Sequence, residues 1–198
     1  MAGFAGIAAA GKSIERLLNA CFAEDEPVPG KRTRAVLART GDFEESNRAS
    51  GIGSPAVSIF LYRVDFNKTM RAAWSAVGSQ DGRSHLAVDL HFLLTPWAEN
   101  AEFEHRILGK VLQCIETKPV LSGPLLHPST DWAPNESLQL VAEDVSTEAI
   151  MRTFDSLPTD YRLSVPYIAR LVRIDGPRAS IDVPVTTAIT GTAAGLTV

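Results

Sequence analysis

Residues 86–94 of the chain read Leu86-Ala-Val-Asp-Leu-His-Phe-Leu-Leu94, and this stretch decides the fold. Large apolar side chains stand at every second position, with mostly smaller or polar residues between them. Successive side chains of a strand point to opposite faces of a sheet, so this period of two predicts a β-strand with one strongly apolar face. Thr95-Pro96-Trp97 is expected to close that strand.

Four further segments are predicted to be strands of the same sheet. Residues 55–66 are apolar on both sides of an extended chain, which indicates a strand at the centre of the sheet, covered on both faces. Residues 161–175 alternate over a long stretch but contain Pro166, which cannot donate a ladder hydrogen bond. We therefore expect that strand to lie at an exposed edge or at a bulge. Shorter strands are expected at residues 33–40 and 137–142.

Three helices are predicted from apolar residues that recur at helical spacing. The first covers residues 4–22. The second begins after Asn100, whose side chain can cap it, and ends before Lys118, because Pro119 restricts the residue that precedes it. The third begins after a capping Ser146 and ends before Pro158.

The intervening segments, residues 42–54, 67–83 and 119–134, are polar or rich in proline and glycine and are predicted to be loops. Strands and helices do not alternate regularly, so the predicted fold class is α+β, a single mixed sheet with two or three helices packed on it. Residues 1–175 are predicted to form this domain, and residues 176–198 an extended C-terminal tail.

Composition narrows the possible partners. The chain has 198 residues, of which 45% are apolar, and a formal charge of -4. That charge lacks the basic excess that nucleic acid or an anionic membrane requires, so protein partners are favoured. We find no secretory signal and no apolar run near the roughly 20 residues that cross a bilayer, and expect a cytoplasmic protein. Cys21 and Cys114 are expected to be buried and apolar in character.

The chain carries no motif for phosphate binding, zinc proteolysis or serine hydrolysis, and we predict neither an enzyme nor a bound cofactor or metal. Asp89 and His91 share a strand face, as an acid-base pair would. A hydrogen-bonded structural patch explains them better, because Leu93 and Thr95 stand on the same face. His127 lies near Asp131 without metal-ligand spacing.

Seven residues are candidates for a protein interface. Three tryptophans lie in or beside predicted loops, where an aromatic ring either anchors a partner or covers the end of the core. Four residues of the tail are mostly β-branched and suit a strand added to a neighbour's sheet, although a frayed terminus is the alternative. The candidates are Trp74, Trp97, Trp132, Val183, Val185, Thr187 and Ile189.

Four blocks of sequence carry a resemblance to a known family. They are Ser58-Ile-Phe-Leu-Tyr-Arg-Val-Asp65, Leu90-His-Phe-Leu-Leu-Thr-Pro-Trp97, Glu104-His-Arg-Ile-Leu-Gly109 and Leu157-Pro-Thr-Asp-Tyr-Arg-Leu-Ser-Val-Pro-Tyr-Ile-Ala-Arg170. In order and spacing they resemble the tail terminator, or cap, proteins of extracellular contractile injection systems of the Photorhabdus virulence cassette and antifeeding prophage type.

This resemblance implies a structural protein with a phage tail-terminator-like fold. It implies a hexameric ring that closes the distal end of the inner tube and contacts the last sheath ring, within a phage tail-like particle assembled in the cytoplasm. The implied partners are further copies of the chain, the inner tube protein and the sheath protein. Two alternatives stay open: a small cytoplasmic α+β enzyme or ligand-binding domain, and a completion protein of an ordinary phage tail.

Overall fold

The computed structural model describes residues 3–70, 84–128, 132–133 and 135–176. Its helices and strands, with η marking a short 3-10 helix, are α1 (Gly6–Glu24), β1 (Arg34–Ala38), η1 (Thr40–Phe43), α2 (Glu45–Gly51), β2 (Ala56–Phe66), β3 (His85–Trp97), α4 (Ala101–Thr117), β4 (Val120–Ser122), η2 (Gly123–Leu125), β5 (Ser137–Ala142), α5 (Thr147–Asp155) and β6 (Val165–Asp175).

The strands form one six-stranded sheet in the order β1-β2-β3-β6-β5-β4. β1 runs parallel to β2, and the other neighbouring pairs are antiparallel. This mixed sheet with helices packed against it confirms the predicted α+β class. β3, the strand with the strict period of two, lies at the centre beside β6.

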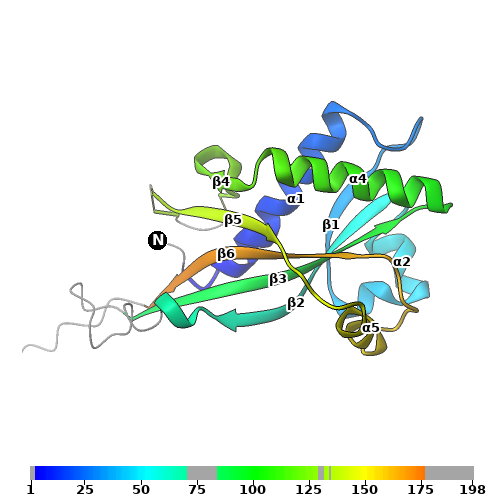
Figure 1. Cartoon of the computed structure of the whole chain (residues 1–198). Helices are drawn as coiled ribbons and strands as arrows, with labels where there is room; N and C mark the ends of the chain where they lie inside the picture. The colour runs from blue at the N-terminus through cyan, green and yellow to red at the C-terminus, as the bar shows by residue number, and fades with distance from the viewer. Residues whose placement is uncertain (1–2, 71–83, 129–131, 134, 177–198) are drawn as a thin grey trace, which may run out of the picture.

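The main core lies between the sheet and two helices, α1 and α4, which cover one of its faces (Figure 1). Ile14 and Leu18 of α1 meet Leu90 and Phe92 of β3 in this core, and none of the four is more than 1% exposed. The predicted cap of α4 is confirmed, because the Asn100 side chain accepts a hydrogen bond from the backbone N–H of Phe103. That bond satisfies one of the free donors of the first turn and fixes where the helix begins.

A smaller core lies on the opposite face of the sheet. Phe43 of η1 and Phe154 of α5 pack there against Leu93 and Trp97 of β3. Figure 1 places α2 and α5 on the side of the sheet away from α1 and α4. The half of β3 that ends at Trp97 is therefore buried on both faces.

The prediction of a loop over residues 42–54 is wrong, because part of η1 and all of α2 lie within it. Helix α2 buries none of its residues and so carries no apolar stripe from which it could be recognised. η1 is held locally, since Asp42 accepts hydrogen bonds from the backbone N–H and the side chain of Arg39. Phe43 is what anchors this segment, at 0% exposure.

The prediction of an edge position for the last strand is also wrong. β6 begins at Val165 and lies between β3 and β5. The carbonyl of Pro166 accepts a hydrogen bond from the N–H of Glu143, one residue beyond the end of β5. The nitrogen of Pro166 therefore also faces Glu143, and because proline has no N–H the return bond of this pair is missing, so the pairing with β5 ends here. The exposed edges belong to other strands.

The two strands next to each other in the sequence, β2 and β3, also differ from prediction. β3 continues through Pro96 to Trp97, which pair with Val57 and Ala56. β2 lies one place from the edge rather than at the centre, and only its first half is buried on both faces. Its second half, which includes Val64, is exposed because the described helices of the second face do not reach it.

The outer edge of β1 is occupied by a side chain. Asn19 of α1 accepts a hydrogen bond from the N–H of Ala35 at 3.0 Å and donates one to the Ala35 carbonyl at 2.9 Å. One amide thus satisfies both backbone groups of Ala35, as the next strand of a sheet would. It also fastens α1 to β1, which positions the helix over the main core.

Replacing Leu90 or Phe92 by alanine should destabilise the chain strongly, because both side chains are buried between β3 and the helices. Lost burial and the remaining cavity together should lower the free energy of unfolding by about 2–5 kcal/mol. Chemical denaturation with circular dichroism measures this change. Met151→Ala on exposed α5 is the control and should unfold at nearly the wild-type denaturant concentration. Unchanged midpoints in the two core variants would contradict the assignment of β3.

Candidate functional site

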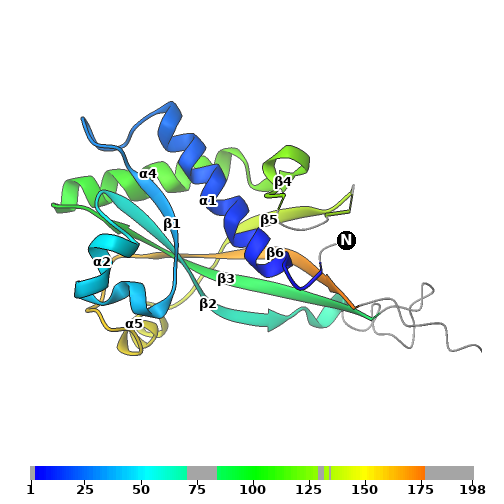
Figure 2. The same ribbon diagram turned by 180° about the vertical axis from the view of Figure 1, so that it is seen from behind.

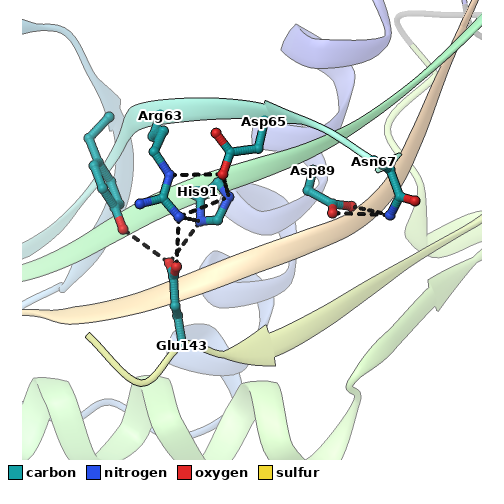
Figure 3. A network of polar contacts seen from close by, with 7 residues as sticks. Arg63, Asp65, Asn67, Asp89, His91 and Glu143 are labelled. Atoms are coloured by element: carbon teal, nitrogen blue, oxygen red, sulfur yellow. Dashed lines mark hydrogen bonds and ion pairs between the residues drawn. The ribbon is translucent and has the colours of Figure 1, made fainter. Parts of the chain in front are cut away.

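Asp89 and His91, the pair singled out from the sequence, belong to a polar network on the sheet face opposite α1 and α4 (Figure 3). His91 of β3 stands across from Arg63 of β2, and Asp89 across from Asp65. A register shift between Leu61 and Arg63 lets β2 keep this alignment. Glu143, which follows β5, completes the network from the far side of β6.

His91 is enclosed by charged side chains. Its Nδ1 lies 2.8 Å from Oε2 of Glu143, and its Nε2 lies 3.2 Å from Oδ2 of Asp65. The Arg63 guanidinium donates to Glu143 at 2.9 Å and contacts Asp65 at 3.2 Å. Tyr62 adds a hydrogen bond from its hydroxyl to Glu143 at 3.0 Å. Each of the two carboxylates therefore has a cationic or hydrogen-bonding partner, and the Arg63 guanidinium also contacts the His91 ring at 3.0 Å.

The pKa values within the network follow from burial and from these bonds. Burial acts to raise the pKa of Glu143, but hydrogen bonds from His91 and Tyr62 and the charge of Arg63 outweigh it, so the pKa lies below the ordinary value. Burial, followed by the bond to Glu143, raises the pKa of Tyr62 to about 12. Tyr62 is therefore a protonated donor at neutral pH and Glu143 an ionised acceptor.

Asp89 has a separate partner. Both of its carboxylate oxygens accept hydrogen bonds from the Asn67 amide, at 3.1 and 3.4 Å. A hollow of about 670 Å³ lies beside Asp65, Asn67 and Asp89. His91 does not line it and is 3% exposed. A general base must reach its substrate, so the network favours a structural clamp across β2, β3 and β5 over acid-base chemistry.

The described residues contain no group of three or more histidine, cysteine or acidic side chains that could hold a metal ion. Cys21 and Cys114 are free and buried, as predicted, and they contact each other between α1 and α4. Burial, followed by the hydrogen bond that the Cys114 thiol donates to Cys21, raises the pKa of Cys114 to about 12. A thiol that stays protonated is a poor nucleophile, so this pair is part of the packing.

The tryptophans occupy different environments. Trp97 is 3% exposed, and its indole donates to the Ser58 hydroxyl at 2.9 Å, so in this chain it covers the end of the core. Trp132 is partly buried and donates to the His127 carbonyl at 2.8 Å. Trp74 and the four candidates of the tail, Val183, Val185, Thr187 and Ile189, lie outside the described residues.

One surface feature was not anticipated from the sequence. A hollow of about 810 Å³ lies between α2, the start of α4 and the loop of residues 157–163. Arg162 lines it, with its guanidinium 3.0 Å from Glu104 and 4.4 Å from the centre of the Trp97 ring. Tyr161 and Leu163 are 44% and 43% exposed beside it. Glu104 and Arg162 belong to two of the four sequence blocks that carry the family resemblance, and this was the only sequence feature that could have pointed to their contact.

No helix among the described residues is long and apolar enough to span a membrane. The sequence profile of the Pvc16 N-terminal domain family matches residues 9–188. The chain belongs to this family. The profile therefore includes three of the tail candidates as well as the folded domain, and the resemblance deduced from the four blocks is confirmed.

Two solved structures share the fold of this Pvc16 N-terminal domain. One is the PVC sheath/tube terminator of an extracellular contractile injection system in its extended state, with a TM-score of 0.52 and 18% identity. The other is the tube-terminating cap of the anti-feeding prophage, with a TM-score of 0.53 and 17% identity. The matches cover 94% and 91% of the present chain, but only 64% and 59% of those proteins. Curated proteins gave no significant match.

The network around Glu143 should make stability depend on pH in a defined direction. A carboxyl whose pKa is lowered by folding stabilises the folded state above its unfolded pKa, near 4.5, and this contribution disappears as the pH falls through the folded pKa. Glu143→Gln should therefore lower the free energy of unfolding by roughly 1–3 kcal/mol at pH 7, and by progressively less below pH 4. Urea denaturation over this pH range measures both effects.

The control is Glu148→Gln, which removes an exposed carboxylate that pairs with Arg152 on α5. It should change stability little at any pH, because exposed ion pairs contribute little. A penalty for Glu143→Gln that stays the same from pH 7 to pH 3 would contradict the assignment of an ionised, hydrogen-bonded Glu143.

Proposed function

We propose that this chain is the tube terminator, or cap, of an extracellular contractile injection system. Six copies form a ring that closes the end of the inner tube distal to the baseplate and contacts the last ring of the sheath. Its partners are its own copies, the inner tube protein and the sheath protein, and it uses no cofactor and binds neither nucleic acid nor membrane. Assembly takes place in the cytoplasm, on a phage tail-like particle.

The observation that carries this proposal is the family match over residues 9–188, together with a fold shared with a sheath/tube terminator and a tube-terminating cap. Those structures are assembly components, in agreement with the prediction that the chain is not an enzyme. The closed polar network is consistent with this reading, because its histidine is enclosed rather than presented to a ligand.

Exposed apolar side chains also suit a subunit with several neighbours. Met151, Tyr161 and Leu163 are 43–48% exposed around α5 and the loop that follows it. Val64 is 42% exposed at the far end of β2, and Val120 is 46% exposed on β4. Apolar side chains that lie in separate places on the surface can contact separate partners, as a ring subunit between a tube and a sheath requires.

Two other functions remain as alternatives to be tested. A small enzyme or ligand-binding domain would use the hollow beside Asp65, Asn67 and Asp89, and would bind a small molecule as a monomer. A completion protein of an ordinary phage tail would share both fold and role but belong to another particle. Neighbouring genes for tube, sheath and baseplate proteins without genes for a phage head distinguish the proposal from the second alternative.

Deleting the gene from a system that produces particles should abolish the control of tube length. The end of a tube keeps its addition-competent surface until something closes it, because head-to-tail contacts propagate indefinitely. Electron microscopy should show tubes or sheaths of irregular length, or particles that do not persist. The wild-type gene on a plasmid should restore uniform particles. Uniform, stable particles in the deletion strain would contradict the cap assignment.

The role of the polar network can be separated from that of an interface or an active site. Asp89→Ala combined with His91→Ala should leave capped particles of normal length, provided that the variant protein is folded. Circular dichroism establishes folding, and electron microscopy measures cap occupancy. Loss of caps with a well-folded double variant would assign these residues to an interface instead.

A further inference from the structure

The second half of β2 has an outer edge that no described strand pairs with. β1 pairs with β2 only from Ala56 to Phe60, so Leu61–Asp65 continue beyond its end. We call these five residues the open edge. In Figure 2 this part of β2 runs along the lower rim of the sheet. Elsewhere on the described sheet, Asn19 occupies the edge of β1, and the strand at the other margin, β4, has only three residues.

The backbone of the open edge is oriented to accept a strand. The N–H of Asn67 donates to the carbonyl of Ala87, so Asn67 faces β3. Bonded and non-bonded residues alternate along an antiparallel pair, and Asp65 therefore also faces β3 while Val64 faces outward. Val64 is 42% exposed, so its amide, its carbonyl and its side chain are all presented at the rim.

The chain leaves the sheet at the same end. Asp175, the last residue of β6, pairs with His85 at the start of β3, and the N–H of Gly176 donates to the Ser84 carbonyl. β2 ends there as well, because Phe66 pairs with Val88. Residues 181–190, which follow a five-residue linker, read Ile-Asp-Val-Pro-Val-Thr-Thr-Ala-Ile-Thr. Such a β-branched, nearly uncharged segment suits a strand that is added to an existing edge.

We propose that the open edge binds residues 181–190 of a neighbouring copy of this chain as an added β-strand. The inference rests on the proposed ring, whose contacts it describes. A linker of five residues spans about 16 Å, which is long enough to leave one subunit and reach another that is packed against it. Pro184 takes a position whose nitrogen faces away from the open edge, so that it removes no hydrogen bond.

Pairing with the chain's own edge is disfavoured by topology. To reach the outer side of its own β2, the segment would have to cross the connection between β2 and β3, residues 67–84, at the same end of the sheet. Connections at one edge of a sheet rarely cross each other. Donation between subunits avoids this crossing and gives a head-to-tail contact, the type of contact that closes rings.

Cross-linking tests the proposal directly in assembled particles. One chain carries Val64→Cys, and a second chain, co-produced with the tube and sheath proteins, carries cysteine at position 183, 185, 187 or 189. Under mild oxidation a covalent dimer of the two chains is expected for one or two neighbouring tail positions. The native Cys21 and Cys114 are buried and do not compete. Met151→Cys, equally exposed but on α5, replaces Val64→Cys as the control and should give only background.

A second variant distinguishes loss of strand pairing at the open edge from loss of folding. Val64→Pro removes one outward N–H and leaves the hydrogen bonds to β3 intact, so the isolated protein should stay folded, with a nearly unchanged unfolding midpoint. In particles, the cross-link from Phe66→Cys, an exposed position on the same strand face as Val64, to the tail position two residues from the reactive one should fall to background when Val64→Pro is added. Val64→Ala keeps the amide and should retain the cross-link.

The cross-linking results distinguish which segment occupies the open edge. An intrachain cross-link in a doubly substituted chain, with none between mixed chains, would overturn the proposal in favour of the chain's own tail. A cross-link from Val64→Cys to the sheath protein, or none to any tail position in visibly capped particles, would also overturn it while leaving the cap function in place. Particles that carry no copy of the chain at their ends would refute the proposed function itself.

Discussion

The fold depends on the burial of β3 on both faces. Leu90 and Phe92 face α1 and α4, whereas Leu93 and Trp97 face η1 and α5. Since alternate residues of a strand point in opposite directions, a strand that is apolar at consecutive positions needs a cover on each side. The long helices supply one cover along the strand, and the short helices supply the other only near Trp97. Farther along β3, where the short helices no longer cover this face, the side chains are the polar His91 and Asp89. Glu143 after β5 bonds to His91, and Asn67 after β2 bonds to Asp89.

The polar network therefore holds the strands together on the same face as the second core, through ion pairs and hydrogen bonds instead of apolar packing. Arg63 and Glu143 come from segments that are separated by 80 positions, and their ion pair links the end of β5 to β2 across β3 and β6. A buried charge is tolerated only where it is paired and hydrogen-bonded. Such a clamp fixes the position of β2 relative to β3 and the end of β5, and this is a mechanical role rather than a catalytic one.

The sequence correctly predicted the helices and strands whose own residue pattern determines them. The period of two from Leu86 to Leu94 predicted β3, and the Asn100 cap with its apolar stripe predicted α4. The prediction failed where contacts with residues far away in the sequence determine the structure. α2 buries no side chain, and Pro166 marks the end of β5 rather than the edge of the sheet. The partners of His91 were equally out of reach, because Glu143 becomes its neighbour only through the strand order. The family, by contrast, was recoverable from four short blocks, since their order does not depend on contacts.

The amide of Asn19, which occupies both backbone groups of Ala35, has a consequence for how copies of the chain can associate. It closes the outer edge of β1 at Ala35, and β4, at the other margin of the described sheet, has only three residues. In the proposed strand exchange, one acceptor edge among the described strands and one donor segment would give each molecule a valence of two. Under that proposal, molecules of valence two form closed rings or linear chains and cannot branch, and Asn19 contributes by keeping the Ala35 edge from pairing with another chain.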